Sequence, residues 1–168
     1  AGEESSDLHA ANLFLKLKEL SPEINAYGVG GQRMAGVGVH LLEDMASHAV
    51  IGFWEVLKKY VYFKKVMESS VQWIKENRPD AVILVDSPGF NLRLAGRIQG
   101  LGIPIIYYIC PQVWAWGHNR VHQIEKLIDK MMVILPFETR LFQNSELETV
   151  FVGHPLLDII KVNKTREF

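Results

Sequence analysis

Short apolar segments alternate with longer amphipathic ones along this chain, and that alternation restricts the fold more than any other feature. Residues 81–85, AVILV, are apolar throughout, which is typical of a strand covered on both faces of a parallel sheet. Further strands are predicted at 24–31, 103–109, 130–135 and 148–153. Helices are predicted from near 5–7, over 53–76, 89–102, 118–129 and 136–144, and from 154 onward. This order predicts βαβ units, and therefore an α/β fold with a doubly wound, mostly parallel, Rossmann-like sheet.

The composition of the 168-residue chain is that of one domain with a sizeable core. Hydrophobic residues make up 48% of the chain and charged residues 22%. The formal net charge of −1 argues against nucleic-acid binding, which normally requires a basic excess. The single cysteine, Cys110, excludes an internal disulfide and indicates a reducing compartment. We therefore expect a cytoplasmic protein without nucleic-acid partners.

Four polar or glycine-rich segments follow the predicted strands: GVGG, DSPGFN, CPQVWAWGHNR and GHP. In open parallel sheets, ligands bind beyond the carboxyl ends of the strands, where these segments should lie. The GVGG segment is also explained by tight turns, and it is not a dinucleotide fingerprint because no GxGxxG is present. The histidines lack the spacing of metal ligands, so we expect no metal site.

Asp86 follows the strand at 81–85 directly and precedes the next predicted helix. One role for it is a helix cap, because carboxylates often accept hydrogen bonds from the first N–H groups of a helix. However, Ser87 is itself a good cap, and Ser87 and Pro88 separate Asp86 from the periodic residues. A carboxylate at the end of a buried strand is partly desolvated, which suits it to accept a proton. Both roles stay open on position alone.

Two tryptophans stand in the predicted loop after residue 109. Gln112, Trp114 and Trp116 occupy alternate positions in this loop. Tryptophans in a loop often form a platform for a flat ligand or a sugar face. The other interpretation is a loop that closes the core from above.

Residues 50–67 combine aromatic side chains with four lysines. One stripe of the predicted helix fits a helix docked on a sheet, and it holds Phe53, Leu57, Tyr60, Val61 and Met67. Aromatic residues beside lysines also describe a helix that lies on anionic lipid, with Tyr62 among the lysines. The membrane contacts in that interpretation are Phe53, Trp54, Lys58, Lys59 and Tyr62.

Seven segments together resemble the lipid A disaccharide synthase family, and the resemblance spans essentially the whole chain. They are AGEESSDLH (1–9), GVGGQRM (28–34), VIGFWEVL (50–57), DSPGFNLRLA (86–95), YYICPQVWAWGHNRV (107–121), ILPFE (134–138) and FVGHPLLD (151–158). Each segment is modest alone, but seven in this order are specific.

The resemblance implies a GT-B glycosyltransferase, an enzyme with two Rossmann-like domains that face each other across a cleft. This family transfers 2,3-diacylglucosamine from UDP to 2,3-diacylglucosamine 1-phosphate with inversion, forming a β-1,6 linkage. It needs no cofactor and no metal, and it acts in the cytoplasm, peripherally on the inner membrane. The resemblance assigns the catalytic base to Asp86. It assigns substrate binding to Glu3, Ser5, Ser6, Asp7, Asn91, Gln112, Trp114, Trp116, Arg120 and His154.

The chain departs from the family pattern at several positions and in length. Glu4 and Ser6 replace an alanine and a glycine, and a side chain at Ser6 is expected to crowd its loop. Gly89 stands where many members have a second aspartate, and Cys110 stands where serine is usual. The family's first strand and its C-terminal nucleotide-sugar domain have no counterpart here. We therefore expect residues 1–168 to be a single partial Rossmann-like domain, the acceptor-binding half, which is inactive alone. A homodimer is one possible state of the full-length protein.

Two other functions fit the residues. One is a membrane-surface lipid-binding module without catalysis, which rests on residues 50–67. The other is a GT-B transferase that acts on another glycolipid.

The shorter chain is expected to have one of two structural consequences for the sheet. Either the two neighbours of the missing first strand contact each other directly, or two strands stay unpaired.

Overall fold

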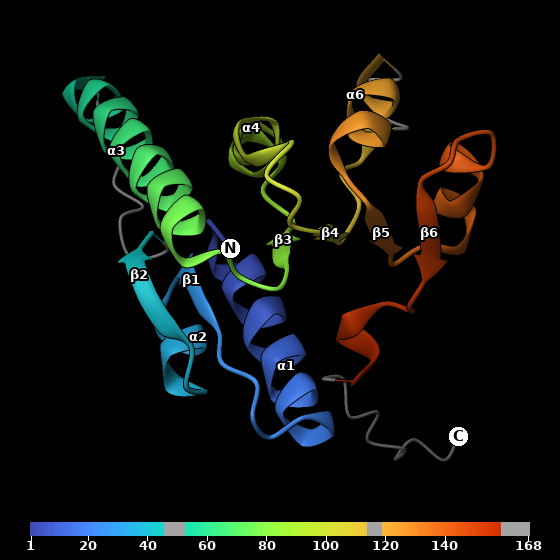
Figure 1. Cartoon of the computed structure of the whole chain (residues 1–168), viewed down its shortest axis with the longest axis horizontal. Helices are drawn as coiled ribbons and strands as arrows, with labels where there is room; N and C mark the ends of the chain where they lie inside the picture. Colours follow the sequence, from blue (N-terminus) through green and yellow to red (C-terminus); the bar gives the residue numbers. More distant parts are fainter. Residues whose placement is uncertain (46–52, 114–118, 159–168) are drawn as a thin grey trace, which may run out of the picture.

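The computed structural model describes residues 1–45, 53–113 and 119–158, with the side chains of the helix at 53–77 described from Tyr60 onward. The first part of the chain forms α1 (Glu4–Leu20), β1 (Tyr27–Gly30), α2 (Gln32–Gly36), β2 (His40–Asp44) and α3 (Phe53–Asn77). The second part forms β3 (Val82–Val85), α4 (Pro88–Ile98), β4 (Ile105–Tyr108), α6 (Asn119–Leu127) and β5 (Lys130–Val133). It ends with η2 (Pro136–Phe142), β6 (Glu148–Phe151) and η3 (Pro155–Asp158) (Figure 1).

The sequence predicts most of these elements, with three differences. The helices predicted from 136 and from 154 are short 3-10 helices, η2 and η3, over the described residues. The short elements α2 and β2 were not predicted. The helix α2 has only five residues and lies between glycines, and β2 has only two apolar residues, so neither shows a clear period.

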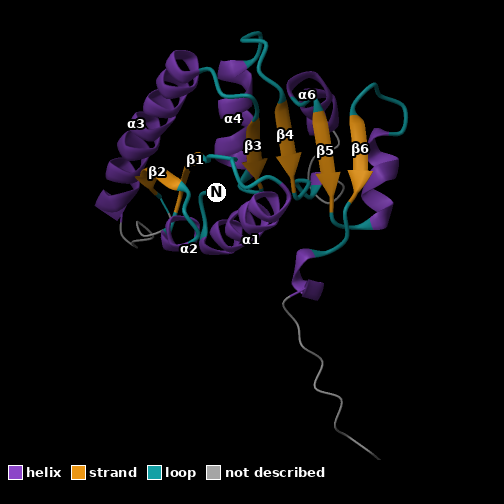
Figure 2. Ribbon diagram, turned by 60° about the horizontal axis from the view of Figure 1, so that its bottom comes forward, coloured by secondary structure: helices purple, strands orange, loops and turns teal. Residues whose placement is uncertain are grey.

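The strands pair in parallel, as predicted, but they form two sheets. One sheet has the order β3-β4-β5-β6, and the other pairs β1 with β2 (Figure 2). Helices α3, α4 and α6 lie on one side of the larger sheet and α1 on the other (Figure 1). Helices therefore lie on both sides of the sheet, which fits the buried aliphatic residues Leu84 and Val85 of β3 and Ile105 of β4.

The main core lies between the four-stranded sheet and α3, α4 and α6. Tyr107 of β4, Met131 of β5 and Ile124 of α6 are fully buried there. A second, smaller core joins α1 to α2 and the loop before β2, through Phe14, Met34 and Val39. Such burial stabilises by about 1.5–3 kcal/mol for each large apolar side chain.

The edges of β1 and β3 are unpaired within the described residues and line the same apolar cavity. Its volume is about 680 Å³, and its walls include Phe14 of α1, Tyr27 of β1 and Ile83 of β3. Tyr27 and Ile83 remain 50% and 38% exposed. Of the two expected consequences of a missing strand, the structure has the unpaired edges and not direct pairing.

Candidate active site

Asp86 lies at the carboxyl end of β3 in a strained turn. Its φ angle is 48°, and that of the next residue, Ser87, is 45°. Two successive residues with side chains in the left-handed region are unusual, because the Cβ atom crowds the backbone there. Strain of this kind persists only where surrounding contacts hold it, and it concentrates at functional sites.

Three hydrogen bonds hold the backbone of this turn. The backbone N–H of Asp86 donates to the carbonyl of Tyr108 at 3.0 Å. The carbonyl of Asp86 accepts a hydrogen bond from Asn91 Nδ2 at 2.6 Å and another from the Tyr107 hydroxyl at 2.6 Å. The backbone of Asp86 is thus fixed by α4 and β4, while its side chain has no part in these bonds.

Asn91 and Tyr107 act here as supports for the strand end. Asn91 is 3% exposed, and its amide also donates to the carbonyl of Val85 at 3.1 Å. Burial, followed by the nearby charge of Asp86, raises the pKa of Tyr107 far above its ordinary value, so its hydroxyl keeps its proton. The sequence predicts Asn91 as a substrate ligand, whereas its described contacts are with the Asp86 turn.

Ser87, and not Asp86, stands at the cap position of α4. Ser87 makes no side-chain cap hydrogen bond, because its hydroxyl faces the start of α1. Its oxygen accepts from the N–H of Gly2 at 3.3 Å and lies 3.5 Å from Ser6 Oγ. The capping interpretation of Asp86 is therefore wrong for this turn, which leaves its carboxylate for another role.

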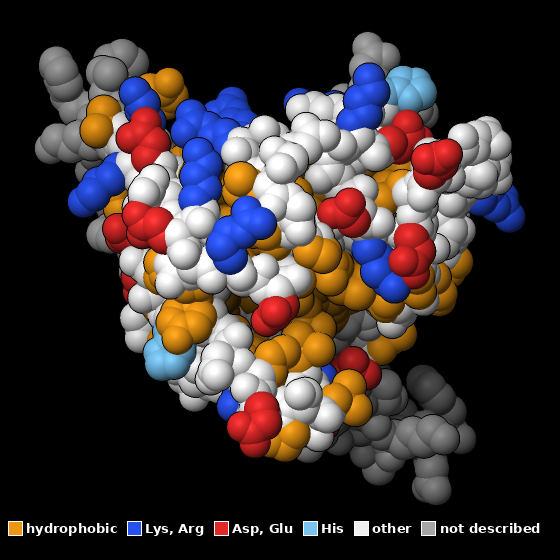
Figure 3. Space-filling model, viewed as in Figure 1, with side chains coloured by type: hydrophobic (Ala, Val, Ile, Leu, Met, Phe, Trp, Pro, Cys, Tyr) orange, Lys and Arg blue, Asp and Glu red, His pale blue; other side chains and the backbone are white. Residues whose placement is uncertain are grey.

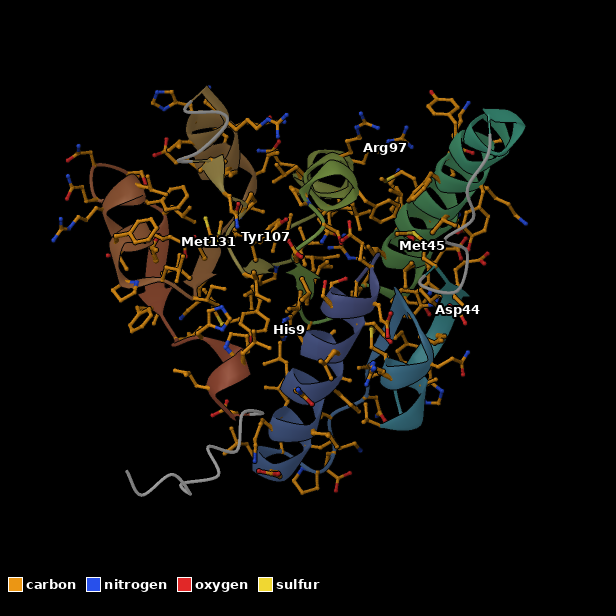
Figure 4. The ribbon with its side chains drawn as sticks, turned by 180° about the vertical axis from the view of Figure 1, so that it is seen from behind. His9, Asp44, Met45, Arg97, Tyr107 and Met131 are labelled. Atoms are coloured by element: carbon orange, nitrogen blue, oxygen red, sulfur yellow. The ribbon has the colours of Figure 1, made fainter. Side chains whose placement is uncertain are left out.

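His9 lies on α1 (Figure 4), and the charge of Asp86 acts on its ring. Burial lowers the pKa of His9 below its ordinary value, the charge of Asp86 partly opposes that lowering, and His154 adds to it. The Nδ1 atom of His9 is buried and, among the described residues, has no hydrogen-bond partner. The structure thus brings His9, Asp86 and His154 within electrostatic reach of one another.

The sequence predicts His154 and Asp86 as site residues but not His9. The available signal was its position at the end of the AGEESSDLH segment. Its relation to Asp86 emerges only from the fold, where α1 packs against β3 and the charge of Asp86 acts on the His9 ring. His154 Nδ1 itself accepts from the N–H of Leu156 at 3.3 Å.

The predicted residues at the start of α1 divide into exposed and buried ones. Glu3 and Ser5 are exposed, whereas Ser6 is fully buried. Ser6 Oγ accepts from the N–H of Glu3 at 2.9 Å and lies 2.8 Å from its carbonyl. The expected crowding by Ser6 is therefore absent, because the hydroxyl is used inside the first turn of the helix.

Asp7 has a structural role. Its carboxylate is 2% exposed and accepts three backbone hydrogen bonds at the start of α2. The donors are the N–H groups of Gly31 at 2.7 Å, Arg33 at 3.0 Å and Met34 at 3.3 Å. A buried carboxylate with three such bonds is satisfied by the protein, so its described contacts do not point to a substrate.

A groove of about 1030 Å³ opens beside this turn, and we refer to it as the α3–α4 groove. A space of this size accommodates a small-molecule ligand. Its walls come from residues 2–4, from 87–90, from Met45, and from side chains of α3 and α4. The side chains are Tyr60, Tyr62, Phe63, Lys64, Met67, Arg93 and Arg97. Of the predicted substrate ligands, Glu3 lies in these walls.

The remaining predicted site residues are only partly described. Gln112, in the segment after β4, and Arg120, in α6, are exposed. Trp114 and Trp116 lie outside the described residues. The backbone of Phe53, Trp54, Lys58 and Lys59 is helical, but their side chains lie outside the described part of the chain.

The helix α3 buries only part of the stripe that the sequence predicts. Met67 is buried as predicted, with Val66 beside it, whereas Tyr60 and Val61 are 66% and 65% exposed. The predicted stripe is therefore wrong at Tyr60 and Val61, and the side chains of Phe53 and Leu57 lie outside the described residues. Tyr62 is half-buried, and its hydroxyl donates to the carbonyl of Asp44 at 3.1 Å.

The described residues hold neither a cluster of metal-binding side chains nor a helix that could span a membrane. In residues 1–45, 53–113 and 119–158, no group of three or more His, Cys, Asp or Glu side chains is arranged to hold a metal ion. Within the same ranges, no helix is both long and apolar enough to cross a membrane.

Comparison with known proteins identifies relatives over the whole chain. The family model described as lipid-A-disaccharide synthetase matches residues 1–168. Lipid-A-disaccharide synthase 1 of Legionella pneumophila strain Philadelphia 1 is 45% identical over 167 residues, which is 99% of this chain and 44% of that protein. The lipid-A-disaccharide synthase of Syntrophus aciditrophicus is 44% identical with the same coverage. That of Nitrosococcus oceani is 44% identical over 161 residues, which is 96% of this chain and 42% of the relative.

The chain therefore spans less than half the length of these relatives. The match of one family model to every residue and the high identity both agree with the motif order and with the parallel α/β architecture. This chain belongs to the lipid-A-disaccharide synthetase family.

Proposed function

We propose that this chain is the acceptor-binding part of a lipid A disaccharide synthase with a GT-B architecture. In this proposal, residues 1–168 form one partial Rossmann-like domain, and a second domain grips the UDP of the donor. The observation that carries the proposal is the turn at Asp86. A carboxylate on a strained backbone, at the carboxyl end of the buried strand β3 and beside a ligand-sized groove, supports a catalytic role.

The proposed reaction requires one base. The 6-hydroxyl oxygen of the acceptor attacks C1 of the donor sugar, and the bond from C1 to UDP breaks. The proton of the hydroxyl goes to the carboxylate of Asp86, and UDP leaves with the bonding electrons. A single displacement inverts the configuration at C1, which gives the β linkage from an α-linked donor.

The rigid support of Asp86 favours this chemistry. A base is effective when its oxygen is held within hydrogen-bond reach of the proton that it accepts. The bonds from Asn91, Tyr107 and the backbone fix the Asp86 turn and leave the carboxylate oxygens for the acceptor. The reaction as written balances without a cofactor or a metal, and we propose none.

The substrates in this proposal are UDP-2,3-diacylglucosamine and 2,3-diacylglucosamine 1-phosphate. Their acyl chains tie them to a bilayer, so the enzyme is proposed to work at the inner membrane surface from the cytoplasm. The exposed aromatic and apolar side chains near the start of α3, Tyr60 and Val61, support such a contact.

A direct test uses the full-length gene product with the two substrates. We expect disaccharide and UDP in equal amounts, and an anomeric proton coupling in the NMR spectrum that marks the β linkage. An acceptor without acyl chains serves as the specificity control, because a transferase for another glycolipid would not depend on them. Absence of the disaccharide, or an α linkage, would reject the proposal.

A second candidate, a lipid-binding module without catalysis, is favoured by the exposed side chains of α3. It predicts co-sedimentation with anionic vesicles, lost when Lys58, Lys59, Lys64 and Lys65 are replaced by glutamine. Each lysine near an anionic surface contributes about 1 kcal/mol, so the loss should be large. Binding to anionic vesicles together with absent sugar transfer would favour this candidate, and absent vesicle binding would remove it.

A further inference from the structure

The α3–α4 groove has a cationic side whose charges are not used by the rest of the structure. Arg93 and Arg97 lie one helical turn apart on α4, and both are exposed. Within the described residues, neither has an ion-pair partner, and Lys64 across the groove lies 3.9 Å from Glu68. Figure 4 shows Arg97 projecting from α4 on the side of α3.

Like charges at this spacing repel each other, so the pair of arginines is unfavourable without an anion nearby. Lys and Arg side chains gather over α3 and α4 on this face of the molecule (Figure 3). The acidic residues of the groove, Glu3 and Glu4, come from the start of α1, and Glu4 lies 3.4 Å from Arg33 outside it. The α4 side of the groove is therefore the side that suits an anion.

The floor of the same groove is apolar. Met67 is 6% exposed, and the rings of Phe63 and Phe90 lie 6.3 Å apart, joining α3 to α4. The exposed ring of Tyr60 extends this surface along α3. Apolar area of this kind is stabilised by burying a hydrocarbon chain, whereas free phosphate or a nucleotide would leave it exposed.

We propose that the α3–α4 groove binds the acceptor as an acyl glycolipid that carries a phosphate. Arg93 and Arg97 hold the phosphate through charge-assisted hydrogen bonds, for which the planar guanidinium is suited. The apolar floor takes an acyl chain. Ser87 and Pro88 in the groove wall follow Asp86 directly, which connects this site to the proposed base. The inference rests on the proposed function for the identity of the acceptor sugar.

The test is isothermal titration of the full-length gene product with a short-chain, water-soluble diacylglucosamine 1-phosphate and with the same compound lacking the phosphate. The main variant is Arg93→Gln with Arg97→Gln. Matched controls are Arg140→Gln, an exposed arginine on η2, and Lys75→Gln, an exposed lysine farther along α3. Because all four side chains are exposed, the variants should keep the near-ultraviolet circular dichroism of the wild type.

We expect the double variant to bind the phosphorylated compound about tenfold or more weakly, as loss of charged hydrogen bonds implies. Binding of the compound without phosphate should change by less than about twofold, and the controls should bind both as wild type does. Arg93→Lys with Arg97→Lys should recover part of the affinity, because charge returns without the bidentate geometry. Inorganic phosphate alone should bind far more weakly than the glycolipid.

Two results of the titration would overturn the inference, and a third comes from vesicle binding. One is wild-type affinity of the double variant for the phosphorylated compound. The other is equal loss for both compounds, which would indicate a lost fold or a purely apolar site. Binding only to anionic vesicles, with none to the soluble compound, would also overturn it and would assign the cations to the membrane surface.

A sugar-transfer assay on the same preparations separates this inference from the proposed function. Transfer by the wild type with unchanged binding by the double variant rejects the groove assignment and leaves the function standing. Phosphate-dependent binding without any transfer supports the groove assignment and rejects the function.

Discussion

At the scale of single residues, the structure shows how the backbone of the carboxylate residue at the end of a buried strand is held. Position alone left Asp86 between a cap and a proton acceptor. The structure removes the first role, because the cap position of α4 belongs to Ser87, and the second role stays our proposal. The Asp86 backbone is held by Asn91 and Tyr107. The sequence could predict the location of Asp86 but not its backbone angle, nor the approach of His9 from a helix far away in the chain.

His9 should make stability depend on pH. Its pKa is lowered in the folded state, so between that value and the ordinary value of 6.5 the unfolded chain binds more protons. The stability contributed by the neutral ring is present above pH 6.5 and is lost as pH falls through the lowered pKa. We expect the free energy of unfolding to fall from pH 7.5 to pH 5.5, and to fall less in His9→Gln.

The measurement is urea unfolding of both proteins across this range. His122→Gln is a suitable control, because His122 is exposed on α6 and distant from the turn. An equal pH dependence in wild type and His9→Gln would contradict the assignment of this titration to His9.

At the scale of elements, continuous aliphatic runs and helix periods were sufficient to predict the four-stranded sheet and its helices. They were insufficient for short elements, and for helices whose buried face is determined by tertiary contacts. The strand β2 lacks a run, and the exposed face of α3 at Tyr60 and Val61 has the same period as the buried one at Met67. Periodicity shows which residues share a face of a helix, and tertiary contacts decide which face is buried.

The carboxyl end of α3 offers a stabilising substitution. Arg78 has a φ of 47°, is exposed, and donates its N–H to the carbonyl of Ile74 at 3.0 Å, which are features of a helix end that favours glycine. We expect Arg78→Gly to raise the free energy of unfolding by about 0.5–1 kcal/mol, because glycine has no Cβ atom to crowd the backbone there.

Lys75→Gly on the same helix gives the matched contrast. Lys75 is exposed inside α3, where glycine costs about 1 kcal/mol in helix propensity. Denaturant unfolding of the two variants should therefore shift in opposite directions. A loss of stability in Arg78→Gly would show that the left-handed conformation at this position is not a source of strain.

At the scale of the whole molecule, the two sheets face each other across an apolar cavity. The edges of β1 and β3 that line it have no strand partner within the described residues, and both strands run parallel to their own neighbours. One additional parallel strand between them would join the two sheets into one. An open cavity and two unpaired strand edges lower stability, since the apolar area stays in contact with water and the edges lack ladder hydrogen bonds.

A five-residue apolar extension rich in valine, joined to Ala1, should therefore raise the unfolding midpoint. Cys110 reports the outcome, because it is the single cysteine and is 4% exposed. Burial raises the pKa of its thiol to about 12, so a thiol reagent reacts only after unfolding. A polar extension of equal length is the control, and equal labelling rates for the two extended chains would contradict the cavity interpretation.

The most direct test of the central claim is the kinetics of Asp86→Asn in the full-length gene product. Asparagine keeps the shape of the side chain but cannot accept the proton, so we expect kcat to fall by at least about 100-fold with a similar KM. Asp80→Asn, at the exposed amino end of β3, should keep wild-type kinetics. Wild-type kcat in Asp86→Asn, with transfer otherwise intact, would contradict the assignment of the catalytic base to this carboxylate.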